Sequence, residues 1–215
     1  MSMTFSSLKT QIANTLKRDD LTSRIPEFIE NGEFFIANDV RPRGFEVYVS
    51  STFTAGSGGA IITLPVRFKE MIAFHVLSNA AGTATGTVRS TIQRRPYSYV
   101  RWYGRDQTST GLPKYWAGMG QDNALVALSP SVAFVFNMAY YERLAPLSNA
   151  NTTNWLTDQA PNLLLYGALV QAAPYLREDP RIATWKSLYE DAKSGVNASS
   201  FANKTAEADA ASGGM

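Results

Sequence analysis

Apolar residues in the first part of the chain recur at intervals of three and four, which is the period of an amphipathic helix. The first stripe comprises Phe5, Leu8, Ile12 and Leu16. It predicts a helix over residues 4–18. A second helix is expected over 25–40, because Ser23 stands at an N-cap position and Pro26 falls in the first turn. We expect this second helix to bury four apolar residues: Phe28, Ile29, Phe35 and Ile36.

The period changes to two at Phe45, where apolar residues begin to alternate with polar residues and tyrosine. This alternation is typical of a β-strand. The glycine-rich segment 55–59 predicts a hairpin turn, with Ile61 and Leu64 in the returning strand. Further strands are expected over 71–77, 87–93, 114–117, 124–128 and 132–142. Because Gly and Ser/Thr clusters separate them, they indicate an antiparallel sheet or a small sandwich.

Helical periodicity returns in the last third of the chain. Thr153 is placed to cap a helix that begins near Trp155 and continues to Ala173. A last helix is expected to end at Gly195, with its apolar stripe formed by Ile182, Trp185, Leu188, Tyr189 and Ala192. Residues 196–215 are rich in Ala, Ser, Asn and Gly and have little to bury. We expect them to form a flexible C-terminal tail that a partner orders.

These elements predict an α+β fold in which a bundle of N- and C-terminal helices carries an inserted antiparallel β region. The bundle would comprise residues 1–44 and 143–195, and the inserted β domain residues 45–142. The flexible tail at 196–215 completes the chain.

The composition of the chain excludes several kinds of chemistry. The chain of 215 residues has no cysteine, so disulfides and thiolate ligands are excluded, and its net charge of +2 gives no sign of a dedicated nucleic-acid binder. No window approaches the roughly 18 apolar residues that span a bilayer, so we expect no membrane anchor.

No set of residues indicates catalysis. His75 is the only histidine and lies in a predicted strand, with no nucleophile near it in the pattern. Acidic pairs occur at 19–20, 178–179 and 190–191, and helix starts explain the first two. The glycines of 56–59 lack the Lys-Ser/Thr of a phosphate-binding loop. We therefore predict a protein that is not an enzyme and that needs no cofactor or metal.

The least ordinary stretch interleaves four arginines with four aromatic residues. It comprises Arg94, Arg95, Tyr97, Tyr99, Arg101, Trp102, Tyr103 and Arg105. Arg, Tyr and Trp are enriched at protein interfaces, and the same residue types can hold phosphates and stack on bases. We favour a subunit or partner interface over ordinary packing with solvated arginines, and both over contact with nucleic acid.

A family resemblance rests on longer segments of the chain. The segments are 140–148 (YYERLAPLS), 153–157 (TNWLT), 160–169 (APNLLLYGAL), 172–179 (AAPYLRED) and 185–190 (WKSLYE). Together they resemble the adaptor proteins of tailed bacteriophages, also called head-completion or head-to-tail connector proteins. The likeness extends more loosely to the N-terminal helices, to 64–70 and to 111–115. It does not extend to 80–110, so no binding residue is carried over there.

The resemblance implies a structural virion protein at the junction of capsid and tail, assembled in the host cytoplasm. It implies a ring of twelve copies beneath the portal protein, with tail proteins (nozzle or tail-tube) on its far side and genomic DNA passing transiently through the channel. It also implies that the C-terminal tail reaches the portal. The candidate docking residues there are Val196, Phe201 and Lys204. The alternative is a nucleic-acid-binding module that uses the stretch from Arg94 to Arg105.

Overall fold

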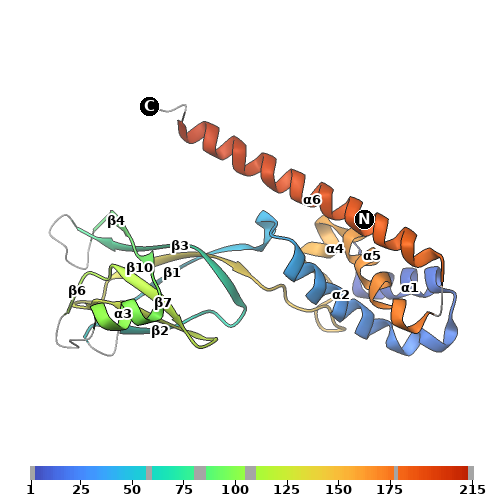
Figure 1. The fold of residues 1–215 in the computed structure, drawn as a ribbon, viewed down its shortest axis with the longest axis horizontal. Helices are drawn as coiled ribbons and strands as arrows, with labels where there is room; N and C mark the ends of the chain where they lie inside the picture. The colour runs from blue at the N-terminus through green and yellow to red at the C-terminus, as the bar shows by residue number, and fades with distance from the viewer. Residues whose placement is uncertain (1–2, 57–59, 80–85, 105–109, 177–178, 213–215) are drawn as a thin grey trace. The chain divides into compact units, whose positions relative to one another are not determined.

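The computed structural model describes residues 3–56, 60–79, 86–104, 110–176 and 179–212, with side chains as far as Ala202 (Figure 1). The chain divides into two compact units, Met1–Phe45 with Arg143–Met215, and Glu46–Glu142. The first is helical and the second is built mainly of antiparallel strands. The predicted α+β fold, with helices at both ends of the chain and sheets between them, is confirmed.

The N-terminal helices are α1 (Phe5–Leu16) and α2 (Ile25–Asp39). A capping box starts α1: the Ser7 amide donates to Thr4 Oγ1 at 3.2 Å, and the Thr4 amide donates to Ser7 Oγ at 2.8 Å. The cap that we expected at Ser23 is wrong. A 3₁₀ turn, η1 (Asp19–Arg24), runs directly into α2 and leaves Arg24 at the cap position, with no side-chain hydrogen bond.

The first two helices bury their predicted stripes with one exception. The buried members are Phe5, Leu8, Ile12, Leu16, Phe28, Ile29 and Ile36. Phe35 keeps 40% of its surface exposed, because it lies at the flank of α2, where its ring meets Tyr189 at 5.3 Å. Gly32 sits where α2 approaches helix α5, and a Cβ at this position would lie 2.9 Å from the backbone nitrogen of Ala168. The lack of a side chain is what permits this close helix packing.

The single helix expected from Trp155 to Ala173 is two helices, α4 (Trp155–Gln159) and α5 (Pro161–Gln171). Proline lacks an amide hydrogen and disfavours the helical conformation in the residue before it. Ala160 accordingly adopts φ −137° and ψ 51°, and the chain bends there. The N-cap is Asn154, not Thr153, and it accepts from the amides of Leu156 and Thr157. A 3₁₀ turn, η4 (Ala173–Tyr175), follows α5.

The last helix, α6 (Arg181–Ser212), continues beyond the end that we expected at Gly195. A glycine inside a helix costs about 1 kcal/mol relative to alanine, and one such residue does not stop a run of good helix formers. Of the stripe predicted for this helix, Trp185 and Tyr189 are buried, whereas Leu188 is 36% exposed. The mobility of residues 196–215 remains a prediction.

The β unit contains two four-stranded sheets. Sheet A is antiparallel throughout, in the order β1 (Glu46–Thr52), β10 (Val135–Glu142), β3 (Phe68–Ser78) and β4 (Val88–Thr91). Sheet B has the order β2 (Ile61–Thr63), β8 (Asn123–Ala127), β7 (Tyr115–Met119) and β5 (Gln93–Arg94), with β5 parallel to β7. A short parallel pair joins β6 (Thr110–Gly111) and β9 (Ser129–Pro130).

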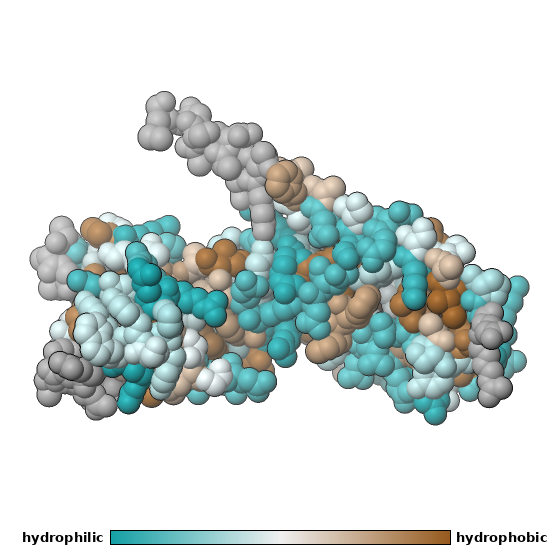
Figure 2. Space-filling model, viewed as in Figure 1, coloured by the Kyte–Doolittle hydropathy of each residue, from teal (hydrophilic) through white to brown (hydrophobic). Residues whose placement is uncertain are grey.

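The two sheets of the β unit share one hydrophobic core, as expected for the small sandwich that the sequence predicted. Its buried members are Phe53, Ile62, Leu64, Phe74, Val76, Ile92, Trp116, Ala124, Val126, Phe134, Phe136, Met138 and Tyr140. The hairpin expected at 55–59 is wrong, because β1 pairs with β10 and β2 pairs with β8. The segment therefore connects the sheets, and within it the Gly56 amide, at φ +85°, donates to the Pro130 carbonyl at 2.8 Å. Figure 2 shows hydrophobic residues on the visible surface of both units.

Candidate interaction surface

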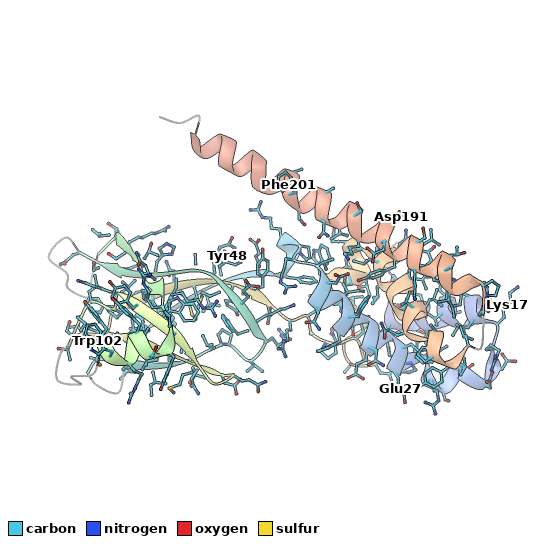
Figure 3. The ribbon with its side chains drawn as sticks, in the orientation of Figure 1. Lys17, Glu27, Tyr48, Trp102, Asp191 and Phe201 are labelled. Carbon is cyan, nitrogen blue, oxygen red and sulfur yellow. The ribbon has the colours of Figure 1, made fainter. Side chains whose placement is uncertain are left out.

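The arginine and aromatic stretch folds into β5 and a short helix, α3 (Tyr97–Tyr103). The helix packs on β7 and β8 of sheet B through Val100, which is 1% exposed among Ala117, Leu125 and Ala127. With Val100 held inward, the other side chains of α3 are left at or near the surface. Figure 3 labels Trp102 on this helix.

Three tyrosines form the floor of this region. The Tyr115 ring, from β7, meets Tyr103 edge-on at 4.9 Å and Tyr99 edge-on at 5.4 Å. Tyr99 and Tyr103 lie nearly parallel at 6.2 Å. Desolvation, together with its hydrogen bond to Tyr115, raises the pKa of Tyr99. The Tyr99 phenol is therefore a neutral hydrogen-bonding group at ordinary pH.

The arginines add positive charge to the rim. The Arg94 guanidinium lies 5.6 Å from the centroid of the Trp116 ring, and that of Arg95 lies 5.7 Å from the centroid of the Tyr115 ring. Arg95 also donates from Nη2 to Gln93 Oε1 at 3.0 Å. Within the part of the chain that the structure describes, neither residue nor Arg101 makes an ion pair with a carboxylate. No carboxylate of that part of the chain therefore neutralises their charge.

Exposed aromatic rings complete the feature, which we call the arginine–aromatic surface. It comprises Arg94, Arg95, Tyr97, Tyr99, Arg101, Trp102, Tyr103 and Tyr115. Trp102 is 62% and Tyr97 46% exposed, and a shallow open depression lies between Arg95, Tyr99 and Trp102. Arg105 lies outside the described residues. Sequence reasoning missed Tyr115, because nothing in the local pattern indicates that β7 lies beside β5.

The second set of predicted residues lies on α6. Val196 is half-buried, whereas Phe201 is 73% exposed and projects from the outer part of the helix (Figure 3). Phe201 borders an open depression along α6 together with Lys193 and Asn197. The backbone of Lys204 is helical, and its side chain lies outside the described part of the chain.

The first half of α6 is anchored to the end of α2. The Tyr189 hydroxyl donates to Asp39 Oδ2 at 2.9 Å, and Lys193 Nζ lies 2.8 Å from the same oxygen. Burial alone would raise the pKa of Asp39, but the hydrogen bonds from Lys193 and Tyr189 outweigh it and hold that pKa below its ordinary value. This anchor ends at Lys193, one turn before the segment that carries the predicted docking residues.

A buried carboxylate that sequence reasoning missed organises the segment entering α4. Glu33, on α2, accepts from the Leu147 amide at 3.0 Å and from Asn154 Nδ2 at 2.6 Å, with 7% of its surface exposed. Burial raises the pKa of Glu33, and these two hydrogen bonds offset part of the shift. Nothing in the pattern distinguished this glutamate from its exposed neighbour Glu30.

The structure also shows the surroundings of the histidine and of the acidic residues that were considered for catalysis. His75 is half-buried on β3, in a depression on sheet A beside Arg89 and Asn137. Asp20 pairs with Arg18 and Asp179 with Arg181. In the described ranges, no group of three histidine or acidic side chains could hold a metal ion. Likewise, none of the helices described there is long and apolar enough to cross a membrane.

Similarity to a known protein family extends over nearly the whole sequence. No curated protein matches it. The family model described as SU10 adaptor protein matches residues 3–212, so it covers both the helical and the β unit. This match confirms the resemblance to phage adaptors that the C-terminal segments indicated. The chain therefore belongs to the SU10 adaptor protein family.

Proposed function

We propose that this chain is a structural virion protein that forms an adaptor ring between the portal and the tail of a tailed phage, leaving a channel for DNA. The family match over residues 3–212 carries this proposal. Because the match includes both units, the adaptor role is proposed for the entire described fold and not for one unit of it. No catalytic step is part of the role.

The proposed ring has twelve copies, assembles in the host cytoplasm and contacts the portal on one side and nozzle or tail-tube proteins on the other. The exposed surfaces of the chain support this proposal. The arginine–aromatic surface combines exposed Trp102 and Tyr97 with guanidinium groups that make no ion pair among the described residues, which is the composition of interface hot spots. We assign this surface to a contact within the assembly.

The outer part of α6 is the proposed portal-docking element, with Val196, Phe201 and Lys204 as its contact residues. A helix of 32 residues is roughly 48 Å long, and the anchor at Asp39 holds only its first half. An exposed phenylalanine on a helix fits the helix-in-groove mode of recognition, in which a partner covers the apolar face.

Native mass spectrometry of the purified chain, alone and mixed with the portal protein of the same phage, tests the proposal. We expect a closed oligomer, or a complex of fixed stoichiometry on the portal, with twelve copies. A chain that stays monomeric and ignores both portal and tail proteins would overturn the adaptor ring.

The arginine–aromatic surface also favours a second candidate function, a nucleic-acid-binding module. Guanidinium groups beside exposed aromatic rings can bind phosphates and stack on bases. This candidate predicts that the isolated chain binds DNA with an affinity that falls steeply as salt increases. The adaptor role predicts weak binding to short DNA and no loss of ring formation when DNA is removed.

A further inference from the structure

Sheet A has an open edge at β1. Its outermost strands are β1 and β4, and β1 is seven residues long. Natural sheets blunt such edges with lysine, proline or bulges, because unpaired backbone groups recruit another strand. The sequence of β1, EVYVSST, contains neither lysine nor proline, and its pairing with β10 is regular. The edge strands of sheet B, β2 and β5, have three and two residues.

The hydrogen-bond pattern shows which residues of β1 face the open edge. The Phe53 amide donates to the Phe134 carbonyl at 2.8 Å, so this pair is hydrogen-bonded. Hydrogen-bonded pairs alternate along an antiparallel ladder. Val47, Val49 and Ser51 therefore bond to β10, and Tyr48, Ser50 and Thr52 direct their N–H and C=O groups outward. These outward groups have no backbone partner among the described residues.

The same reasoning applies to β4 at the opposite edge. The Ile92 amide donates to the Phe74 carbonyl at 2.8 Å, which makes Ser90 and Val88 the residues that bond to β3. Arg89 and Thr91 then direct their backbone groups outward. Their side chains lie on the outer face of the sheet, where Arg89 shares a depression with Tyr48, Ser50 and His75.

The two edges of sheet A are complementary. The sheet has four antiparallel strands, so β1 and β4 run in opposite directions. On both strands, the residues with outward backbone groups carry outer-face side chains. We propose that β1 of one copy pairs antiparallel with β4 of the next copy, so that sheet A continues from subunit to subunit. This head-to-tail contact rests on the proposed ring, since a cyclic assembly requires two different surfaces on each copy.

Charge favours β4 over a second β1 as the occupant of the edge. Glu46 is the only charged residue of β1, and Arg89 is the only one of β4. Arg89 makes no ion pair within the described part of its own chain, whereas Tyr48, on the open edge, is 71% exposed. A neighbouring β4 brings a guanidinium group to the edge strand that carries this tyrosine and this glutamate. A second β1 strand would bring no positive charge to this edge.

The absence of cysteine allows a direct test by cross-linking. The double variant Ser50→Cys with Thr91→Cys is assembled as in the wild type and treated with a short bis-maleimide of about 8 Å reach. Adjacent strands are about 4.8 Å apart, so these two positions are about 14 Å apart within one chain, beyond that reach. We expect a ladder of covalent oligomers. The matched control, Ser50→Cys with Thr63→Cys on β2, should give none.

Each other outcome has a definite meaning. Covalent dimers from Ser50→Cys alone would indicate a two-fold β1–β1 contact and overturn the proposal. A ring seen by native mass spectrometry without a ladder from the double variant would overturn this inference and leave the adaptor ring standing. If the wild-type chain forms no ring, the proposed function fails and this contact fails with it.

Proline substitutions at neighbouring positions provide a second test. Ser50→Pro removes an outward amide, whereas Ser51→Pro removes one that bonds to β10. We expect Ser50→Pro to fold normally and to weaken association by on the order of five- to tenfold per interface. Ser51→Pro should instead lower the melting temperature of the chain. Wild-type assembly by Ser50→Pro would contradict the proposed pairing.

Discussion

The helical unit and the β unit expose apolar surface to different degrees. Among the described residues, the β unit exposes Tyr48, Ile61, Val66, Ile72, Val88, Tyr97, Tyr99, Trp102 and Val132. The helical unit exposes Phe34, Phe35, Tyr175, Leu188 and Phe201. The β unit is the shorter of the two, and yet it carries more of these side chains. Large exposed apolar residues gathered with unpaired charge mark interaction surfaces.

The two units also differ in how their charged side chains are paired. In the helical unit, the carboxylates of Glu33 and Asp39 are tied to partners on other segments, and their hydrogen bonds hold the unit together. In the β unit, Arg94, Arg95 and Arg101 have no carboxylate partner in the described ranges. Stability should therefore respond most to changes inside the helical unit, and assembly most to changes on the surface of the β unit.

The largest effect on folding is expected from Trp185→Ala. This side chain is 4% exposed, and its removal should lower the free energy of unfolding by about 3–5 kcal/mol. Chemical denaturation measures the loss. Leu188→Ala, at a position 36% exposed on the same helix, is the matched control and should cost less than about 1 kcal/mol. Equal losses at the two positions would contradict the burial of Trp185.

A smaller effect is expected from Glu33→Ala. It leaves the Leu147 amide and the Asn154 side chain without their acceptor, which should cost about 1–3 kcal/mol. Glu30→Ala, on the exposed side of the same helix, should change stability by less than about 0.5 kcal/mol. A Glu33 variant as stable as wild type would mean that this network does not hold the helical unit together.

The raised pKa of Glu33 gives its contribution a defined pH dependence. Because the folded state binds this proton more tightly than the unfolded state does, the stabilisation is complete below the ordinary value of 4.5. It is lost as the pH rises through the folded-state pKa. Relative to Glu33→Gln, the wild type should therefore become less stable over the pH range above 4.5. Denaturation of both proteins across this range measures the difference, and a constant difference would refute the shift.

Reversal of Arg94, Arg95 and Arg101 to Glu should affect folding less still. Exposed charges contribute little to the stability of a monomer, so we expect a change within about 1 kcal/mol. Ring formation or docking should fail, because unpaired charges in an interface are costly. Particle assembly and native mass spectrometry provide the measurement. A triple change to Gln separates the loss of positive charge from the gain of negative charge, and normal particles from both variants would refute the interface.

The smallest effect on folding is expected from deletion of residues 196–215. Phe201 is 73% exposed, so the deletion should leave the melting temperature nearly unchanged. Co-purification with the portal should be lost, and Phe201→Ala should weaken it without changing the fold. Full-strength binding by the truncated chain would show that this segment has no docking role.

Local periodicity predicted where helices and strands lie better than it predicted which of them pair or pack together. The stripe from Phe5 to Leu16 is α1, and all seven predicted strand segments overlap observed strands longer than two residues. The errors concern relations between distant segments. Residues 55–59 were expected to form a hairpin because the local pattern does not show that β10 lies beside β1. Phe35 was expected to be buried because the helical stripe does not show that this side chain lies at the flank of α2, against Tyr189 of α6.

The candidate site shows the same limit. The arginines and aromatic residues of 94–103 were evident from composition, whereas Tyr115 joins them only through the pairing of β5 with β7. Glu33 was not evident at all, because its two partners follow it by more than 100 residues. Side-chain type can be read along the chain, but the environment that gives a side chain its role depends on tertiary contacts.

The insertion of the β unit between α2 and α4 also fixes the order in which the chain can mature on the ribosome. Gly32 packs against Ala168, and the buried face of α1 and α2 is completed only by the later helices. Translation at about 5–20 residues per second leaves that face without its native cover for roughly 5–20 seconds while the β unit is synthesised. Leu8, Ile12, Phe28 and Ile29 are fully buried in the finished protein and solvent-accessible during this interval. We expect the nascent chain to be a chaperone client at this stage, and the β unit to fold first.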